Sequence, residues 1–446
     1  MYFKTKNLRL SYVLLTAVML TFISASNLLM AQTSTATMDV KDLTRILETL
    51  AADDMRGRAS LSKDIEKAAD FIASEFKEIG LKPYAEDNYR QTFYVNKLSA
   101  GTQSVTINAQ KLNDDQFLII GNQPEINWSE KSAVQVLKIS KEEDFSQAFR
   151  AIMRTNQGDA VVLVDSSFQP LLARFKKIYS RENILTKEQQ AAKSPTKVFL
   201  VANEKPTEYA INAVNKTEEF PLFNVAAVLP GKSKPNEYVV FSAHYDHIGI
   251  LNAVDQDSIA NGADDDASGT TAVIALANYY KKLNQNERTL IFVAFTAEEI
   301  GMFGSKYFSN KINADEVVAM INIEMIGKDS KFGPNSLYIT GYENSNLGKL
   351  MQENLTGSSF TFHADPYPQQ NLFYRSDNAV LAALGVPAHT FSTSQIDKDS
   401  YYHTVKDEVE TLDIENIRSS IEAIAIGAKG IVDGTQTPSR VEKLKD

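Results

Sequence analysis

The chain of 446 residues contains no cysteine, and this absence limits the chemistry that it can perform. It can form no disulfide bond, carry no lipid on an N-terminal cysteine and bind no metal through thiolates. Any metal ion must therefore be held by histidine, aspartate and glutamate side chains.

The chain has fewer basic than acidic residues: it contains 46 Lys and Arg and 56 Asp and Glu, which gives a formal net charge of −10. The sequence has no tract of clustered Lys and Arg, on which phosphate binding depends, so we expect no nucleic-acid partner. Hydrophobic residues make up 43% of the chain, which is enough for a large core and leaves room for a second, smaller module.

The first residues have the composition of a secretory leader. Basic residues up to Arg9 precede an apolar run from Tyr12 to Ala25, and the small residue Ala31 follows. We predict a signal peptide over residues 1–31 and a periplasmic or secreted mature protein without stable membrane association. Leu29 stands where a small residue is expected before the cleavage site, and an uncleaved membrane anchor is the alternative.

Hydrophobic spacing divides the rest of the chain. Residues 38–98 contain two helical patterns and form the N-terminal part of a main domain. Residues 99–220 are irregular, and we interpret them as an inserted module. Residues 221–434 alternate short β-rich runs with helices, which is typical of an α/β layer fold with a mostly parallel sheet, and residues 435–446 form a tail.

Each expected element follows from this periodicity. The strands cover residues 160–164, 198–201, 238–243, 289–295, 317–322, 336–340 and 388–391, and the helices cover residues 40–52, 63–79, 268–282, 346–355, 377–384 and 414–432.

The strand at 238–243 runs directly into His244-Tyr245-Asp246-His247. Open α/β folds place their sites at the carboxyl ends of strands, so His244 is a candidate metal ligand. Asp246 can accept a hydrogen bond from the other ring nitrogen of His244, which would fix the tautomer of the imidazole.

Three adjacent acids, Asp264 to Asp266, lie at the start of a predicted helix within Gly-Ala-Asp-Asp-Asp-Ala-Ser-Gly. A single aspartate would be enough to cap the helix. Three adjacent carboxylates repel one another unless a cation neutralises them, which favours a metal site.

Two further strands also end in acids. Glu298 and Glu299 follow the strand at 289–295, and such a pair suits a site where one carboxylate binds a metal and the other takes a proton from water. Glu324 lies inside an apolar run after the next strand, where a buried carboxylate needs a cation or a strong hydrogen-bond partner. Three strands thus deliver His, Glu-Glu and Glu to one edge of a sheet, which indicates a metal site.

Taken in order, these blocks resemble metallopeptidase family 28, which includes secreted bacterial leucyl aminopeptidases, glutamate carboxypeptidases and glutaminyl cyclases. The resemblance covers roughly His244 to His403 and rests on His-Tyr-Asp-His, the Gly-Ala-Asp-Asp-Asp block, Ala-Glu-Glu-Ile-Gly and Tyr-His-Thr. It implies a three-layer α/β/α fold of the zinc-dependent exopeptidase type, with a central mostly parallel mixed sheet. The irregular module resembles the protease-associated insertion of some members.

The resemblance also implies the role of each site residue. Two zinc ions would be bridged by Asp265, with His244 and Glu324 completing one ion and Glu299 and His403 the other. Glu298 would be the general base that takes a proton from water and returns it to the leaving amine. The remaining implied roles are oxyanion stabilisation by Tyr402, substrate contact by Arg375 and a cis peptide before Asp266.

The chain departs from the family pattern at two positions. Glu324 stands where the family usually has aspartate, and Asn378 stands where it has histidine. The longer side chain of Glu324 changes how far that carboxylate reaches. Of the other histidines, we interpret His363 and His389 as core or surface residues and His247 as a support for its loop.

The function that the sequence favours is hydrolysis of peptide substrates by an aminopeptidase with two zinc ions. A carboxypeptidase or dipeptidase on the same site is the nearest alternative. A glutaminyl cyclase ranks third, and a catalytically inactive, peptidase-like binding module is the alternative from another class. All five implied ligand positions and Glu298 carry competent side chains, which favours an active enzyme.

Overall fold

The computed structural model describes residues 38–444 except 85–87, 181 and 193. The predicted leader, residues 1–31, lies outside the described residues. Within the described part, no helix combines the length and apolar character needed to cross a membrane.

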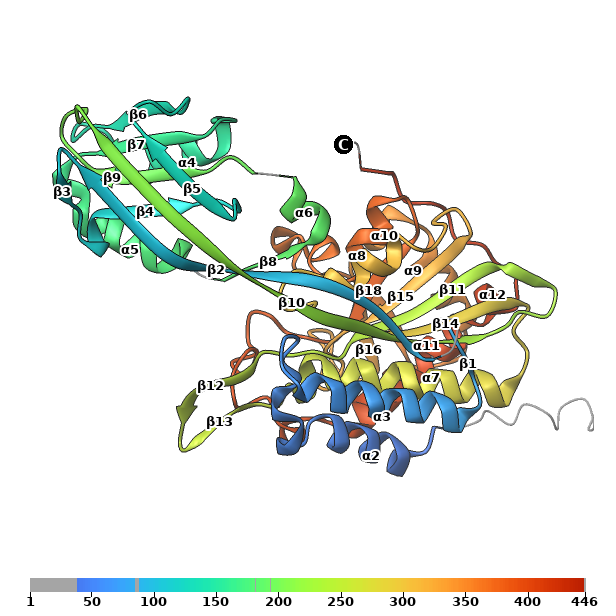
Figure 1. Cartoon of the computed structure of the whole chain (residues 1–446). Coiled ribbons are helices and arrows are strands. Elements are labelled where there is room, and N and C mark those ends of the chain that lie inside the picture. Colours follow the sequence, from blue (N-terminus) through green and yellow to red (C-terminus); the bar gives the residue numbers. More distant parts are fainter. Residues whose placement is uncertain (1–37, 85–87, 181, 193, 445–446) are drawn as a thin grey trace, which may run out of the picture.

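A large mixed sheet forms the centre of the main domain (Figure 1), in the order β17-β16-β18-β15-β11-β14-β10-β2. Its middle is parallel: β11 (Lys234–His244) lies between β14 (Arg288–Phe295) and β15 (Val317–Ile323), and β15 pairs with β18 (Ala388–Ser392). The antiparallel pairings lie towards the edges. The outer strands are β16 (Ser336–Ile339) and β17 (Thr361–Ala364) at one edge and β1 (Lys82–Pro83), β2 (Arg90–Ile107) and β10 (Tyr209–Leu229) towards the other.

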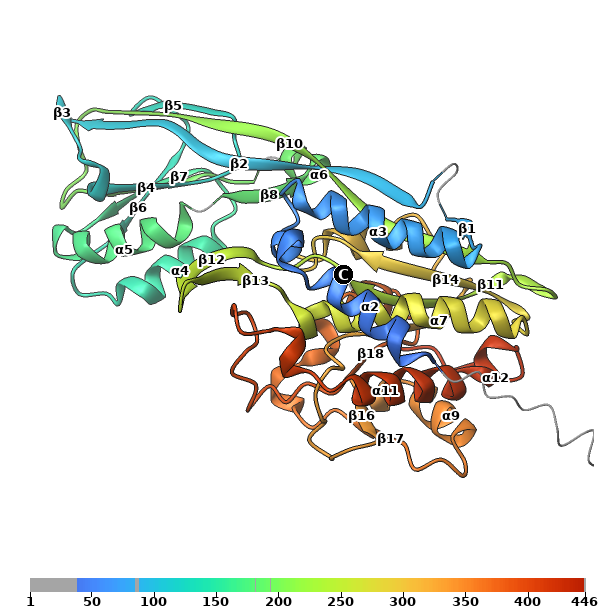
Figure 2. The ribbon, with the colours of Figure 1, turned by 90° about the horizontal axis from the view of Figure 1, so that it is seen from below.

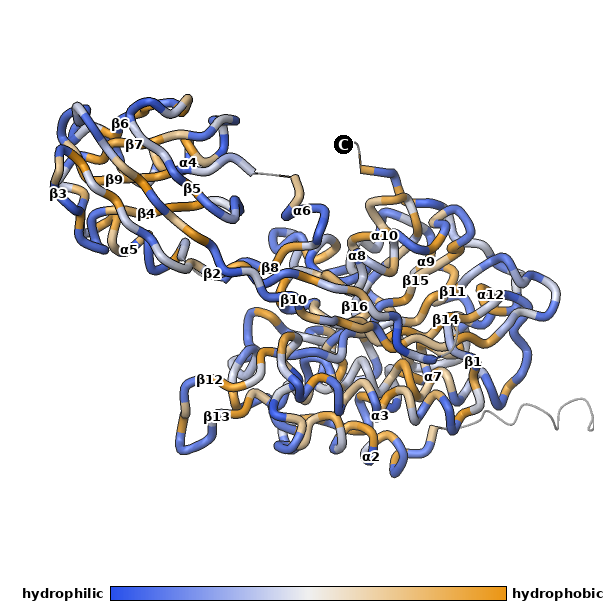
Figure 3. Tube along the Cα trace, in the orientation of Figure 1, coloured by the Kyte–Doolittle hydropathy of each residue, from blue (hydrophilic) through white to orange (hydrophobic). Residues whose placement is uncertain are grey.

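Helices cover both faces of this sheet, and the view from below shows those of one face (Figure 2). Because side chains alternate along a strand, Val239 and Phe241 pack on one face while Val240 packs on the other. The strands are therefore buried on both sides, and Figure 3 shows hydrophobic residues gathered along them. One face carries α2 (Val40–Leu50), α3 (Asp64–Ile79), α7 (Gly269–Leu283), α9 (Leu347–Asn354), α11 (Ile414–Gly427) and α12 (Lys429–Val432), and the other carries α8 (Phe303–Ser309) and α10 (Asn378–Ala383).

These layers confirm the predicted α/β/α fold with a central mixed sheet, whose parallel pairings lie mainly in its middle. The strands and helices expected between residues 238 and 432 are present, with shifted ends. The helix expected over 414–432 is the one that differs, because it is two helices that meet at Ala428. Gly427 and Gly430 flank this break, and glycine is a poor helix former.

Two long strands carry the second module. β2 and β10 pair antiparallel: Arg90 lies opposite Val225 at one end, and Ile107 lies opposite Tyr209 at the other. Both strands run from the main sheet into the module. The boundaries expected at residues 99 and 220 therefore fall inside continuous strands.

The module has its own sheet, in the order β4-β9-β7-β6, and its own buried clusters. Its elements are β3 (Gln110–Lys111), β4 (Phe117–Ile120), β5 (Glu125–Ser129), β6 (Gln135–Ile139), α4 (Phe145–Thr155), β7 (Ala160–Val164), α5 (Gln169–Tyr179), β8 (Asn183–Thr186), α6 (Lys187–Ala191) and β9 (Lys197–Val201). A separate hairpin of β12 (Gly249–Val254) and β13 (Asp257–Ala260) projects from the main domain after β11.

Candidate metal centre

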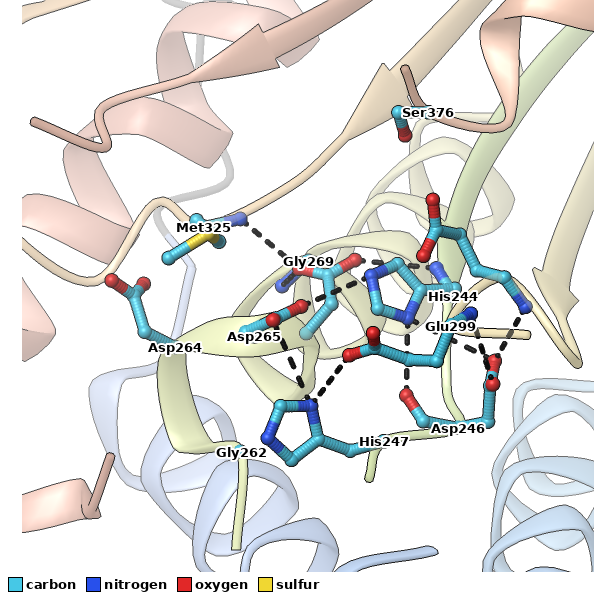
Figure 4. A network of polar contacts seen from close by, with 12 residues as sticks. His244, Asp246, His247, Gly262, Asp264, Asp265, Gly269, Glu299, Met325 and Ser376 are labelled. Atoms are coloured by element: carbon cyan, nitrogen blue, oxygen red, sulfur yellow. Dashed lines mark hydrogen bonds and ion pairs between the residues drawn. The ribbon is translucent and has the colours of Figure 1, made fainter. Parts of the chain in front are cut away.

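The carboxyl ends of three neighbouring parallel strands deliver the candidate residues to one edge of the sheet. β11 ends at His244, Glu298 follows β14, and Glu324 follows β15. The loop that ends in α7 brings Asp265 to the same place, and Figure 4 shows its carboxylate between the rings of His244 and His247.

The Asp265 carboxylate lies between two histidine rings. Its Oδ1 is 3.1 Å from Nε2 of His244, and its Oδ2 is 3.2 Å from Nε2 of His403, which is in turn 3.1 Å from Oε2 of Glu299. Neither Nε2 atom has a hydrogen-bond partner within the described residues, although both are buried. Ring nitrogens and carboxylate oxygens this close without hydrogen bonds between them converge on a shared point, which is the arrangement that ligands of a cation adopt.

This donor set fits zinc. Single ligand atoms of His247, Asp265, Glu299 and His403 all lie within 4.8 Å of one another. Zinc is held by nitrogen and oxygen donors of this kind, and manganese or cobalt are also compatible. The two oxygens of Asp265 face different histidines.

The His244 ring is fixed through its other nitrogen. Nδ1 donates to the backbone carbonyl of Asp246 at 3.0 Å, which leaves Nε2 with a free lone pair. The prediction that the Asp246 carboxylate accepts from this ring is therefore wrong, since the carboxylate lies 3.9 Å from Nδ1. Its oxygens instead accept from Ser60 Oγ at 2.6 Å and from the backbone of Glu298 and Glu299 at 3.1 and 3.4 Å. Asp246 thus positions the paired glutamates.

Of the three adjacent aspartates, only the middle one lies among the histidines. The Asp266 carboxylate accepts from the backbone of His244, Gly269 and Met325, and so connects the loops after β11 and β15 to the start of α7. Asp264 accepts from Gly327 at 2.7 Å. The peptide bond between Asp265 and Asp266 is cis, as the resemblance implies.

The charges of the centre depend on one another. Burial lowers the pKa of His403, but Asp265 and Glu299 outweigh it and raise this pKa to about 10. Burial raises the pKa of Asp265, but His244 and His403 outweigh it and hold this pKa well below its usual range. The site therefore favours a carboxylate at Asp265 and positive charge around it.

Glu298 and Glu324 line the same cavity as Asp265. Burial raises the pKa of each, and Oε2 of Glu324 is buried without a hydrogen-bond partner in the described part of the chain. Both groups are therefore suited to accept a proton or a positive charge.

His247 joins the centre, although its sequence position suggested only support of a loop. Its Nδ1 donates to Oε1 of Glu299 at 2.8 Å and lies 3.7 Å from Oδ2 of Asp265. The available signal was its place three residues after His244 in the same loop.

Sequence reasoning also missed Arg58, a fully buried side chain under the centre. Its guanidinium donates to the backbone carbonyls of Leu50, Tyr245, Asn261 and Gly262 at 2.6 to 2.9 Å. No motif marks this residue, because its partners are backbone atoms of distant segments.

A cavity of about 130 Å³ adjoins the metal centre. Arg375 and Tyr402 line it, as their implied roles require, and both are exposed. The ring of Tyr402 stacks on His403 with 3.9 Å between centroids. Asn378, which replaces the family's histidine, is buried and donates to the carbonyls of Phe373 and Ala388.

The other two histidines lie outside the centre, as predicted. His389 is buried and bonded to Ser345 and the carbonyl of Thr340, and His363 stacks on Phe332.

Residues 224–426 match the model of Peptidase family M28. The matched region contains all five candidate metal ligands, so the candidate centre lies in the part of the chain that is similar to peptidase family M28. It is 33% identical over 124 residues to a protein of Pyrenophora teres f. teres named "Probable zinc metalloprotease", which covers 27% of this chain and 25% of that protein. It is 29% identical over 210 residues to a protein of Arthroderma otae named "Probable leucine aminopeptidase". That alignment covers 45% of this chain and 55% of that protein. The chain thus spans between a quarter and about half of these relatives.

Two solved aminopeptidase structures share the fold. An aminopeptidase from Aneurinibacillus sp. strain AM-1 has a TM-score of 0.54 and 17% identity, over 92% of this chain and 96% of that one. BSAP, a zinc aminopeptidase from Bacillus subtilis, has a TM-score of 0.53 and 14% identity, over 90% of this chain and 97% of that one.

Proposed function

We propose that this protein is an exported aminopeptidase that hydrolyses peptides with two zinc ions. The observation that carries the proposal is the convergence of buried atoms without hydrogen-bond partners, from His244, Asp265 and His403, beside a cavity lined by Glu298. Export is supported by the leader-like composition of residues 1–31, and the peptidase activity by the family and by the names of the relatives.

The proposed ligands are His244, Asp265, Glu299, Glu324 and His403, with Asp265 shared between the ions. Bound zinc would polarise the scissile carbonyl and make water more acidic. The protein's part is to position these ligands: Asp246 holds the backbone of Glu298 and Glu299, and His247 holds the Glu299 carboxylate.

Glu298 is the proposed general base. Its buried position raises its pKa, which makes the carboxylate a better proton acceptor, and its backbone is fixed by Asp246. It would take the proton from the attacking water and deliver it to the leaving amine. Tyr402, an exposed residue of the cavity lining, would donate to the oxyanion.

The cavity favours an N-terminal amine over a C-terminal carboxylate at the metal centre. Asp265, Glu298 and Glu324 all line this end, and the unpartnered oxygen of Glu324 can accept from a substrate ammonium group. A carboxypeptidase or dipeptidase remains the second candidate because Arg375 could bind a terminal carboxylate.

Blocked substrates separate these functions. The purified mature protein should hydrolyse leucine p-nitroanilide and Leu-Leu amide, but not N-acetyl-leucine p-nitroanilide or N-acetyl-Leu-Leu. Cleavage of N-acetyl-Leu-Leu alone would instead establish a carboxypeptidase. Binding of peptides without any cleavage would indicate an inactive binding module, and ring closure of an N-terminal glutamine would indicate a cyclase.

A further inference from the structure

Hydroxyl side chains form much of the cavity wall next to the metal centre. Part of this wall is already engaged, since Thr390 Oγ1 donates to Asn378 and Tyr338 donates to the carbonyl of Ser394. The hydroxyl residues of the lining are Tyr338, Thr340, Ser376, Thr390, Ser392, Ser394 and Tyr402.

Thr340 and Ser394 are among the hydroxyl residues of this wall that keep a proton to donate. Thr340 Oγ1 accepts from the backbone of Thr390 at 3.1 Å but donates to no acceptor among the described residues. Ser394 uses its backbone N–H and its carbonyl, while its hydroxyl has no partner in the same part of the chain. The wall thus offers hydrogen-bond donors that the protein itself does not use.

Arg375 adds a positive charge to these donors. Within the described ranges its guanidinium makes one contact, at 3.5 Å with Gln370, and no ion pair. Lys328, a cation beside the lining residue Asp399, forms ion pairs with Asp399 at 2.8 Å and with Asp264 at 3.4 Å. Asp399 also lines the cavity, but Lys328 already neutralises it.

The cavity lining therefore combines two chemically different sets of residues. The metal centre contributes acids, whereas Ser394 and Thr340 contribute hydroxyl donors without an acceptor in the described part of the chain, and Arg375 contributes a guanidinium whose one hydrogen bond is the long contact with Gln370. Met325, Leu372 and Ile396 supply apolar surface that methylene groups can contact. A donor-lined pocket selects against side chains that leave its polar groups unpaired, and a guanidinium pairs best with a planar carboxylate.

We propose that this cavity binds the side-chain carboxylate of an N-terminal glutamate or aspartate, with Arg375 as the residue that determines this specificity. The inference rests on the proposed aminopeptidase function and adds the substrate class. An N-terminal lysine or arginine is disfavoured because it would meet the charge of Arg375, and leucine is disfavoured because it offers no acceptor to the wall.

The test compares p-nitroanilides of glutamate, glutamine, leucine and lysine on the zinc-loaded enzyme. These substrates share one leaving group and have no C-terminal carboxylate, so any preference reports on the side chain. We expect kcat/KM to be highest for glutamate. In Arg375→Met the ratio of kcat/KM for glutamate over leucine should fall about 10- to 100-fold, the value of one hydrogen bond to a charged group.

Two variants sharpen the test. Arg375→Glu should move the preference towards lysine, a change that loss of structure cannot produce. Arg150→Met removes an exposed arginine of α4, in the second module, and should leave the glutamate-to-leucine ratio unchanged.

The outcomes separate this inference from the proposed function. Hydrolysis of leucine p-nitroanilide without preference for glutamate overturns the inference alone. If Arg375→Met slows only Leu-Leu relative to Leu-Leu amide, Arg375 binds a terminal carboxylate and the inference is wrong. If no free-amine substrate is hydrolysed, the proposed function fails and the inference fails with it.

Discussion

Arg58 donates a hydrogen bond of 2.9 Å through Nη2 to the backbone carbonyl of Gly262. Its Nε donates to the carbonyl of Tyr245 at 2.7 Å. One buried side chain thus connects the loop that begins at His244 with the loop that carries Asp265.

The first prediction concerns this connection. Arg58→Met should destabilise the protein by about 3 to 5 kcal/mol, because several buried carbonyls lose their donor and nearby acids lose a buried positive charge. Urea unfolding of the metal-free protein measures this change. Arg58→Lys keeps the charge but fewer of the hydrogen bonds, and should lie between the two proteins. Equal stability of all three would contradict the structural role of Arg58.

The second prediction concerns the general base. Glu298→Ala should abolish turnover while zinc remains bound, because Glu298 is not among the proposed ligands. Steady-state hydrolysis and zinc content of the same sample measure the two effects. Full activity in this variant would refute the proposed mechanism.

The third prediction concerns His247. Loss of its hydrogen bond to Glu299 should weaken zinc affinity or lower activity about 10- to 100-fold, the usual effect of removing a partner of a ligand. The measurement is hydrolysis by His247→Ala over a series of buffered zinc concentrations. His363→Ala is the matched control, since that ring lies against Phe332 outside the centre. An unchanged zinc dependence in His247→Ala would show that His247 only fills space.

The fourth prediction concerns pH and stability. Burial lowers the pKa of His389 to about 4, although its hydrogen bond to the carbonyl of Thr340 opposes this shift. Between pH 6.5 and 4 the unfolded chain binds a proton at this residue that the folded protein does not. Stability should therefore fall as pH falls, by about 3 kcal/mol across this window. Urea unfolding of the protein and of His389→Gln tests this, and an equal pH dependence in both would contradict the assignment.

The sequence is sufficient to predict where the strand-end residues lie, because their placement follows from the topology of the sheet. Parallel strands end at one edge, so His244, Glu298 and Glu324 had to lie together once the α/β pattern was recognised. Hydrogen-bond partners do not follow in this way. The backbone carbonyl of Asp246, rather than its carboxylate, holds His244, and nothing in the spacing of residues distinguishes the two atoms.

Long-range contacts explain two further features that the sequence does not indicate, the role of Arg58 and the continuity of β10. Arg58 acts through segments remote in the sequence, such as Tyr245 and Gly262, and its partners are carbonyls that every residue possesses. β10 was not recognised as one strand because the exposed stretch from Lys216 to Glu219 interrupts its alternating pattern, while its pairing with β2 continues across that stretch.

The zinc content of the purified mature protein, measured with its hydrolysis of leucine p-nitroanilide, tests the central claim most directly. We expect two zinc ions per chain, loss of both zinc and activity on chelation, and recovery of both when zinc is returned. Asp265→Ala, which lacks the shared ligand, should lose metal and activity together. Full hydrolysis by protein that holds one zinc ion or none, or an active Asp265→Ala, would contradict the two-zinc centre.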